Sequence, residues 1–137
     1  MSDDQVTADT LKKLWDAISN PANEKIRQFI AWSLDKFVNE DSLNYAIDND
    51  LDIISLALNH YALGHSRVTP VFKLAIKMHW NEVESYLTDV EKIFKIINQK
   101  PECAKIINTE RGRSYLNRCC KATYLRLYSL IWEEGQV

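Results

Sequence analysis

Apolar residues recur at intervals of three and four along most of this chain, and no segment alternates apolar and polar residues as a strand does. Intervals of this kind gather apolar side chains on one side of a helix. The pattern predicts an all-α fold, a single-domain bundle of five or six helices covering residues 1–137, with residues 1–7 as a flexible N-terminal tail. The expected helices span residues 8–19, 21–39, 42–63, 70–98, 101–107 and 110–133.

Breaker and capping residues mark the helix boundaries. Pro70 suits the first position of a helix, where its missing N–H would have no partner anyway, and Thr69 is expected to cap that helix. The acidic stretch 48–50 is where the helix over 42–63 is expected to break. From Leu51 to Leu63 this segment is apolar on most sides, which predicts a central element surrounded by other helices.

The segment 70–98 has the most regular pattern of the chain. Its apolar residues follow steps of four and three over three heptads: Ile76, Trp80, Val83, Leu87, Val90, Phe94 and Ile97. About 28 residues in one helix would measure roughly 42 Å, longer than the core of a small globule. A seam of this kind lets a long helix pack nearly parallel to another. We therefore expect it to support self-association, in a homo-oligomer or as a subunit of a complex.

Basic residues gather toward the C-terminal end of the chain. Residues 1–91 hold 8 basic and 15 acidic side chains, a balance of −7, whereas residues 92–132 hold 9 basic and 2 acidic ones, a balance of +7. Glu133 and Glu134 bring the sum to the net charge of −2. Charge asymmetry of this kind is informative about partners rather than about the fold.

The last predicted helix carries the candidate binding residues. At 100° per residue its apolar side chains, Cys119, Cys120 and Leu127 among them, share one broad face. The predicted partner-binding residues lie largely on the other side: Arg111, Arg113, Tyr115, Arg118, Lys121 and Arg126. Guanidinium groups pair with carboxylate or phosphate oxygens, and a tyrosine ring offers a flat contact surface.

These features predict a non-catalytic interaction module, a small helical subunit or adaptor that docks an acidic protein partner through its basic C-terminal helix. The alternative is a nucleic-acid-binding protein that uses the same surface on a phosphate backbone, although a pI of about 5.9 weighs against it. A third interpretation needs no partner: the cations coat a solvated helix face or lie against the acidic part of their own chain. A small helical enzyme is the least favoured class.

Motifs of metal and catalytic sites are absent or incomplete. Residues 48–52 begin like an EF-hand loop, but Ile53 stands where glycine is required and Asn59 where a bidentate glutamate is required. Apart from His60 and His65, which are five positions apart across an expected helix end, the sequence has no zinc-ligand spacing, and it has no glycine-rich phosphate loop. We therefore expect no catalytic residue, no metal site and no cofactor.

Cysteine usage and hydropathy favour the cytoplasm or another reducing intracellular compartment. The chain has three cysteines, and the adjacent Cys119 and Cys120 cannot form a structural disulfide framework. The reactivity of Cys103 is left open. The N-terminus lacks the pattern of a signal peptide, and no apolar run approaches the ~18 residues of a membrane span. We accordingly expect no membrane partner.

Overall fold

The computed structural model describes residues 3–19 and 24–133, which form α-helices joined by short connections and contain no strand. The helices of these two ranges are α1 (Asp3–Ser19), α2 (Lys25–Phe37), α3 (Glu40–Asp48), α4 (Ile53–Leu58), α5 (Thr69–Met78), α6 (Trp80–Leu87), α7 (Val90–Asn98), α8 (Pro101–Ile107) and α9 (Glu110–Tyr128). Two π-helical turns, η1 (Asn59–Leu63) and η2 (Ser129–Glu133), extend α4 and α9. The all-α prediction is confirmed. The predicted number of five or six helices is wrong.

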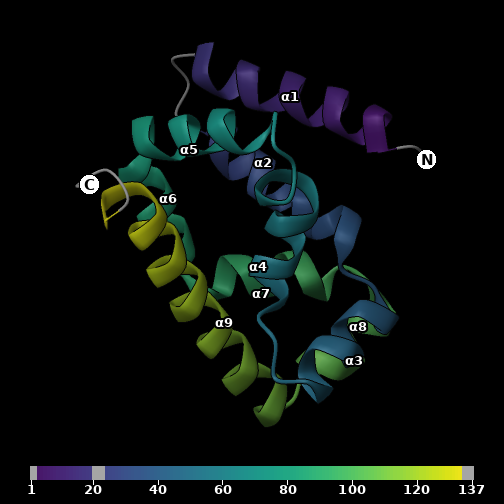
Figure 1. Cartoon of the computed structure of the whole chain (residues 1–137). Coiled ribbons are helices and arrows are strands. Elements are labelled where there is room, and N and C mark those ends of the chain that lie inside the picture. The colour runs from purple at the N-terminus through teal and green to yellow at the C-terminus, as the bar shows by residue number, and fades with distance from the viewer. Residues whose placement is uncertain (1–2, 20–23, 134–137) are drawn as a thin grey trace.

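The helices are arranged around α2 and α4. Figure 1 shows α1 across one end of the molecule beside α5, α3 and α8 at the opposite end, and α9 along one flank. Helix α2 packs on α1, α4, α6 and α7, and α9 packs on α4, α6, α7 and α8. Among the described helices, none is long and apolar enough to cross a membrane.

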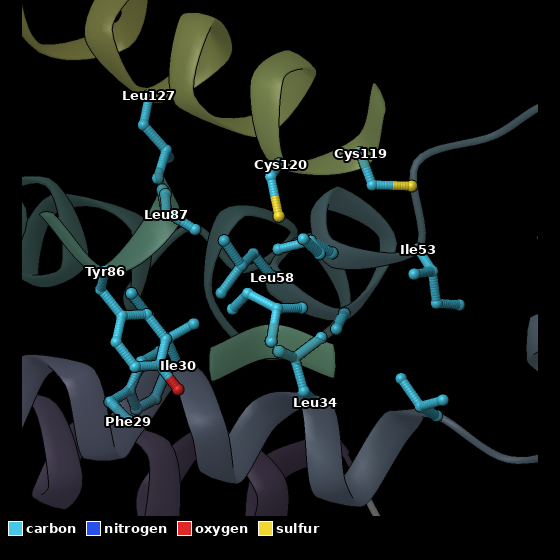
Figure 2. Close-up of a cluster of buried hydrophobic side chains, with 14 of the residues drawn as sticks. Phe29, Ile30, Leu34, Ile53, Leu58, Tyr86, Leu87, Cys119, Cys120 and Leu127 are labelled. Carbon is cyan, nitrogen blue, oxygen red and sulfur yellow. The ribbon is translucent and has the colours of Figure 1, made fainter. Parts of the chain in front are cut away.

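A single hydrophobic core runs between α2 and α9. In Figure 2, α9 contributes Cys120 and Leu127 from one side and α2 contributes Leu34 from the other, with Leu58 and Leu87 between them. Leu34, Leu58, Leu87 and Leu127 are fully buried. The predicted central element is confirmed in α4, whose buried residues are Ile53, Ile54, Ser55, Ala57 and Leu58.

The predicted 28-residue helix is wrong, because the segment 70–98 is divided into α5, α6 and α7. The first break is at His79, which has φ −118° and ψ 33° and whose buried Nε2 lies 2.9 Å from the carbonyl oxygen of Ala17 in α1. The second break follows Thr88, whose hydroxyl donates to the carbonyl oxygen of Glu84 at 2.9 Å. A threonine hydroxyl that bonds to the preceding turn competes with helix continuation.

These breaks turn the predicted self-association seam into the core of the chain itself. Ile76, Val83 and Leu87 are fully buried, and Phe94 is buried as well. Trp80 and Val90 are half-buried and pack against the same core. The seam therefore packs against helices of its own chain.

The remaining boundaries differ in local detail. Helix α1 begins at Asp3, so residues 3–7 belong to it and not to a flexible tail, and the break near 48–50 is confirmed by the loop between α3 and α4. The expected start of the second helix at residues 21–23 lies outside the described residues. Thr69 is the first residue of α5 and does not cap it, because its hydroxyl donates to the carbonyl oxygens of Ala62 and His65.

Helix α9 is seated closely against the end of α8. A Cβ atom added to Gly112 would lie 2.6 Å from the carbonyl oxygens of both Ile106 and Ile107. Contacts between real Cβ atoms and backbone are never this short. Glycine is therefore required here by close approach, and this approach sets the position of the first turn of α9.

Candidate functional site: the outer face of α9

Helix α9 has a clear buried side and a clear exposed side. Its first turn is capped by Thr109, whose hydroxyl accepts a hydrogen bond from the N–H of Gly112 at 2.9 Å. The buried side packs on the core through Tyr115, Leu116, Cys119, Cys120, Thr123 and Leu127. The exposed side, which we call the outer face of α9, includes Arg111, Arg113, Arg118, Lys121, Leu125, Arg126 and Tyr128, together with Glu110, Ser114, Asn117 and Ala122.

Tyr115 does not belong to the outer face, which corrects its predicted role. Its side chain is only 2% exposed. The hydroxyl donates to the carbonyl oxygen of Leu51 and accepts a hydrogen bond from the N–H of Ile53 at 3.1 Å. Tyr115 therefore holds the loop between α3 and α4 against α9 and is not available as a flat contact for a partner.

Two of the predicted arginines pair with carboxylates from the acidic part of the chain. Arg113 lies 3.1 Å from Glu91, with its guanidinium 4.1 Å from the ring centroid of Phe94. Arg118 lies 3.6 Å from Asp50. Both ion pairs are exposed, and pairs of this kind contribute about 0–1 kcal/mol to stability. The interpretation that these cations lie against their own chain is thus correct for two of them, although the pairs are weak enough to exchange.

The other three cations make no ion pair within the described part of the chain. Arg126 donates to the amide oxygen of Asn59 at 2.8 Å, which leaves its charge uncompensated. Arg111 and Lys121 are exposed and have neither a hydrogen bond nor an ion pair to a described residue. The outer face therefore presents three uncompensated positive charges along one helix.

An aromatic cluster at the C-terminal end of α9 was missed by the sequence analysis. Tyr124, Tyr128 and Trp132 follow one another at intervals of four residues, and all three lie near Trp80 of α6, with ring centroids 5.7, 5.9 and 6.4 Å from that of Trp80. Tyr128 is 43% exposed and the neighbouring Leu125 is 54% exposed. The interval of four was visible in the sequence and was the signal that could have revealed this cluster.

The Trp80 side chain is the central ring of the cluster, in contact with Tyr124, Tyr128 and Trp132. Its Nε1–H donates to Glu84 at 3.1 Å, within α6. Nε1 of Trp132 is buried and has no hydrogen-bond partner among the described residues. The cluster thus combines rings fixed against the core with an exposed margin at Tyr128, and rigid aromatic groups of this kind are typical of binding hot spots.

The polar groups around Asp52 are satisfied by hydrogen bonds within the chain. The Asp52 carboxylate accepts hydrogen bonds from the N–H groups of Ile54 and Ser55, from the Ser55 hydroxyl at 2.7 Å and from the Thr123 hydroxyl. This network caps α4 and ties it to α9. Because both oxygens of the Asp52 carboxylate already accept hydrogen bonds from the chain, the role of this network is structural.

The three thiols are buried and held in their neutral form. Cys103 is fully buried, and burial raises its pKa. Burial also raises the pKa values of Cys119 and Cys120 to about 12. Since the thiolate is the reactive form, none of these cysteines has the environment of an activated nucleophile. The described residues bring no three His, Cys, Asp or Glu side chains together in a metal-binding arrangement.

Comparison with known proteins adds no relationship. The chain matches no protein-family model, and no match is found among curated proteins or solved structures. The functional argument therefore depends on the surface and interior described above.

Proposed function

We propose that this chain is a non-catalytic interaction module that docks an acidic protein partner through the outer face of α9. The observation that carries the proposal is the combination of uncompensated cations with exposed apolar groups on one helix. Over Glu110–Tyr128 the five basic residues less one acidic residue leave a charge of +4. Leu125 and Tyr128 lie among these charges as exposed apolar groups.

The partner surface that fits is apolar at its centre and acidic at its rim. Leu125 and Tyr128 would enter the apolar centre, because burying apolar area supplies most of the free energy of association. Arg111, Lys121 and Arg126 would meet carboxylates at the rim, where charges mainly accelerate association and select the partner. The exposed pairs of Arg113 and Arg118 cost little to exchange for carboxylates of the partner.

Site-specific photo-crosslinking tests this assignment. A benzophenone amino acid placed at position 125 is irradiated in native extract, with and without nuclease, and the same group at Tyr45 of α3 serves as the control, since Tyr45 is 61% exposed. We expect a nuclease-resistant protein adduct at position 125 and none at position 45. The absence of any adduct specific to position 125 would refute the proposal.

Charge reversal supplies the second arm of the test. The Arg111→Glu/Lys121→Glu variant alters cations without an ion pair to a described residue, so it leaves the observed ion pairs intact. We expect adduct formation to fall roughly tenfold, which corresponds to ~0.7 kcal/mol for each reversed rim charge. The matched control, Lys12→Glu/Lys77→Glu, makes the same change in net charge on exposed positions of α1 and α5. Equal losses in both variants would show that only net charge matters.

Nucleic-acid binding is the second candidate, favoured by the exposed Tyr128 ring beside the arginines of α9. A phosphate-backbone reader would give an adduct that nuclease removes. Its affinity for duplex DNA would also fall with salt, by about −0.9 in the slope of log affinity against log salt for each phosphate neutralised. Three uncompensated cations predict a slope near −3, and no binding at low salt would eliminate this candidate.

A further inference from the structure

A hollow opens on a part of the molecule that contains no residue of α9. It has a volume of about 320 Å³, at the small end of the range for ligand sites. The first turn of α2 forms one wall and the helices α6 and α7 form the other. Its lining residues are Glu24, Arg27, Gln28, Ala31, Tyr86 and Lys92.

Tyr86 is the buried polar group of this hollow. Its side chain is only 7% exposed, and Figure 2 shows the hydroxyl pointing toward α2. The hydroxyl has no hydrogen-bond partner among the described residues, although it lines the hollow. Burial raises the pKa of Tyr86 to about 12, so the phenol keeps its proton and remains a donor at neutral pH. Because the hydroxyl lines the hollow and is not a fully enclosed atom, a ligand in the hollow can reach it.

Two cations line the same hollow as this hydroxyl. The Lys92 ammonium lies 5.9 Å from the centroid of the Tyr86 ring. Arg27 comes from the first turn of α2 and pairs with Glu24 at 3.4 Å, but the Glu24 side chain is 70% exposed and can swing into solvent. Lys92 is in the first turn of α7, and neither helix start has a side-chain cap. The positive ends of two helix dipoles therefore add to the two side-chain charges.

We propose that this hollow binds a phosphate group, as the free ion or on a small phosphorylated molecule, through Arg27, Lys92 and the Tyr86 hydroxyl. Two cations match the two negative charges of a phosphate monoester, and the guanidinium, ammonium, phenol and Gln28 amide supply donors for its three terminal oxygens. On binding, the phosphate displaces the Glu24 carboxylate from Arg27 and provides the missing partner of Tyr86.

Titration of the ¹⁵N-labelled protein with inorganic phosphate and with phenyl phosphate tests the site. Potassium chloride at the same ionic strength is the reference. We expect saturable shifts in the amide signals of Arg27, Gln28 and Lys92. Tighter binding of phenyl phosphate identifies an organic phosphate as the ligand, and equal affinities identify the free ion. Shifts that do not saturate, or that spread over all basic segments, would overturn the proposal.

Three variants and one control complete the experiment. Arg27→Gln and Lys92→Gln should each weaken binding about tenfold, since each removes a charged hydrogen bond at a partly exposed site. Tyr86→Phe keeps the ring and should weaken binding severalfold. Lys36→Gln removes the same charge from the last turn of α2, outside the hollow, and should leave the affinity unchanged. Equal affinity of Arg27→Gln, Lys92→Gln and Lys36→Gln would overturn the assignment.

Discussion

Replacing Tyr115 by phenylalanine removes only a hydroxyl, but this hydroxyl joins α9 to the loop between α3 and α4. In the native chain it accepts from the N–H of Ile53 at 3.1 Å and donates to the carbonyl oxygen of Leu51. The phenylalanine ring fills the same space, so the variant leaves no cavity beyond the oxygen atom. The expected effect is therefore the loss of two hydrogen bonds with packing preserved.

The size of the loss in unfolding free energy depends on which group loses its hydrogen-bond partner. Ile53 is fully buried, so its N–H is left without a partner and without water, at a cost of about 1–3 kcal/mol. Leu51 is 36% exposed, and its carbonyl oxygen regains solvent at little cost. For a domain near this size, about 1–3 kcal/mol lowers the melting temperature by roughly 3–10 °C.

Urea denaturation followed by circular dichroism measures this change, with melting curves as a second readout. Tyr45→Phe is the matched control, because Tyr45 is 61% exposed and loses a solvated hydroxyl. We expect Tyr45→Phe to stay within about 0.5 kcal/mol of the native chain. Equal free energies of unfolding for Tyr115→Phe and Tyr45→Phe would refute the structural role of the Tyr115 hydroxyl.

Further predictions concern close packing, thiols and the buried polar network. Gly112→Ala should lower the melting temperature, because the new Cβ would lie 2.6 Å from the carbonyl oxygen of Ile107. This clash should outweigh a helix-propensity gain of about 1 kcal/mol, and thermal melts show whether the melting temperature falls or rises. Burial raises the pKa values of Cys119 and Cys120 from 9.0 to about 12, so the unfolded chain loses these protons first. These two thiols should leave the free energy of unfolding constant below about pH 8 and lower it above about pH 9, by up to ~1.4 kcal/mol per pH unit each. In urea titrations between about pH 9 and 10, the double alanine variant should lose this contribution and keep the slope due to Cys103, whose pKa burial also raises. Thr123→Val removes a donor to the partly buried Asp52 carboxylate and should cost about 2 kcal/mol of unfolding free energy, measured by the same titrations.

The local pattern of apolar residues was sufficient to predict the fold class and several of the helices. The helix predicted at 101–107 is α8, and the segment predicted at 110–133 is α9 with η2. Periodicity succeeds here because a helix must turn its apolar side toward the core whatever lies opposite. The same periodicity over 70–98 predicted one long helix, since a heptad pattern continues across a bend when both halves face the same core. The first break is at His79, which bonds to α1 in a contact between residues 62 positions apart.

For the outer face of α9 as well, the sequence predicted some features and contacts between distant residues decided others. The sequence identified the exposed cations of α9, but it assigned Tyr115 to them because helical-wheel positions near the boundary of a face are ambiguous. The wheel also could not show that Glu91 of α7 reaches Arg113, or that Asp50 of the loop between α3 and α4 reaches Arg118. The hollow beside Tyr86 lies between α2 and the helices α6 and α7, and no local sequence motif predicts it.

The sequence by itself determined that the chain is helical, where α8 and α9 lie, and that its positive charge gathers on the last helix, because these properties depend on residues three and four positions apart. Tertiary structure alone decided where the central segment bends, which cations keep their charge uncompensated, and which polar groups converge on the hollow. Those properties depend on pairs of residues far apart in the chain, which meet only when the helices pack around a common core.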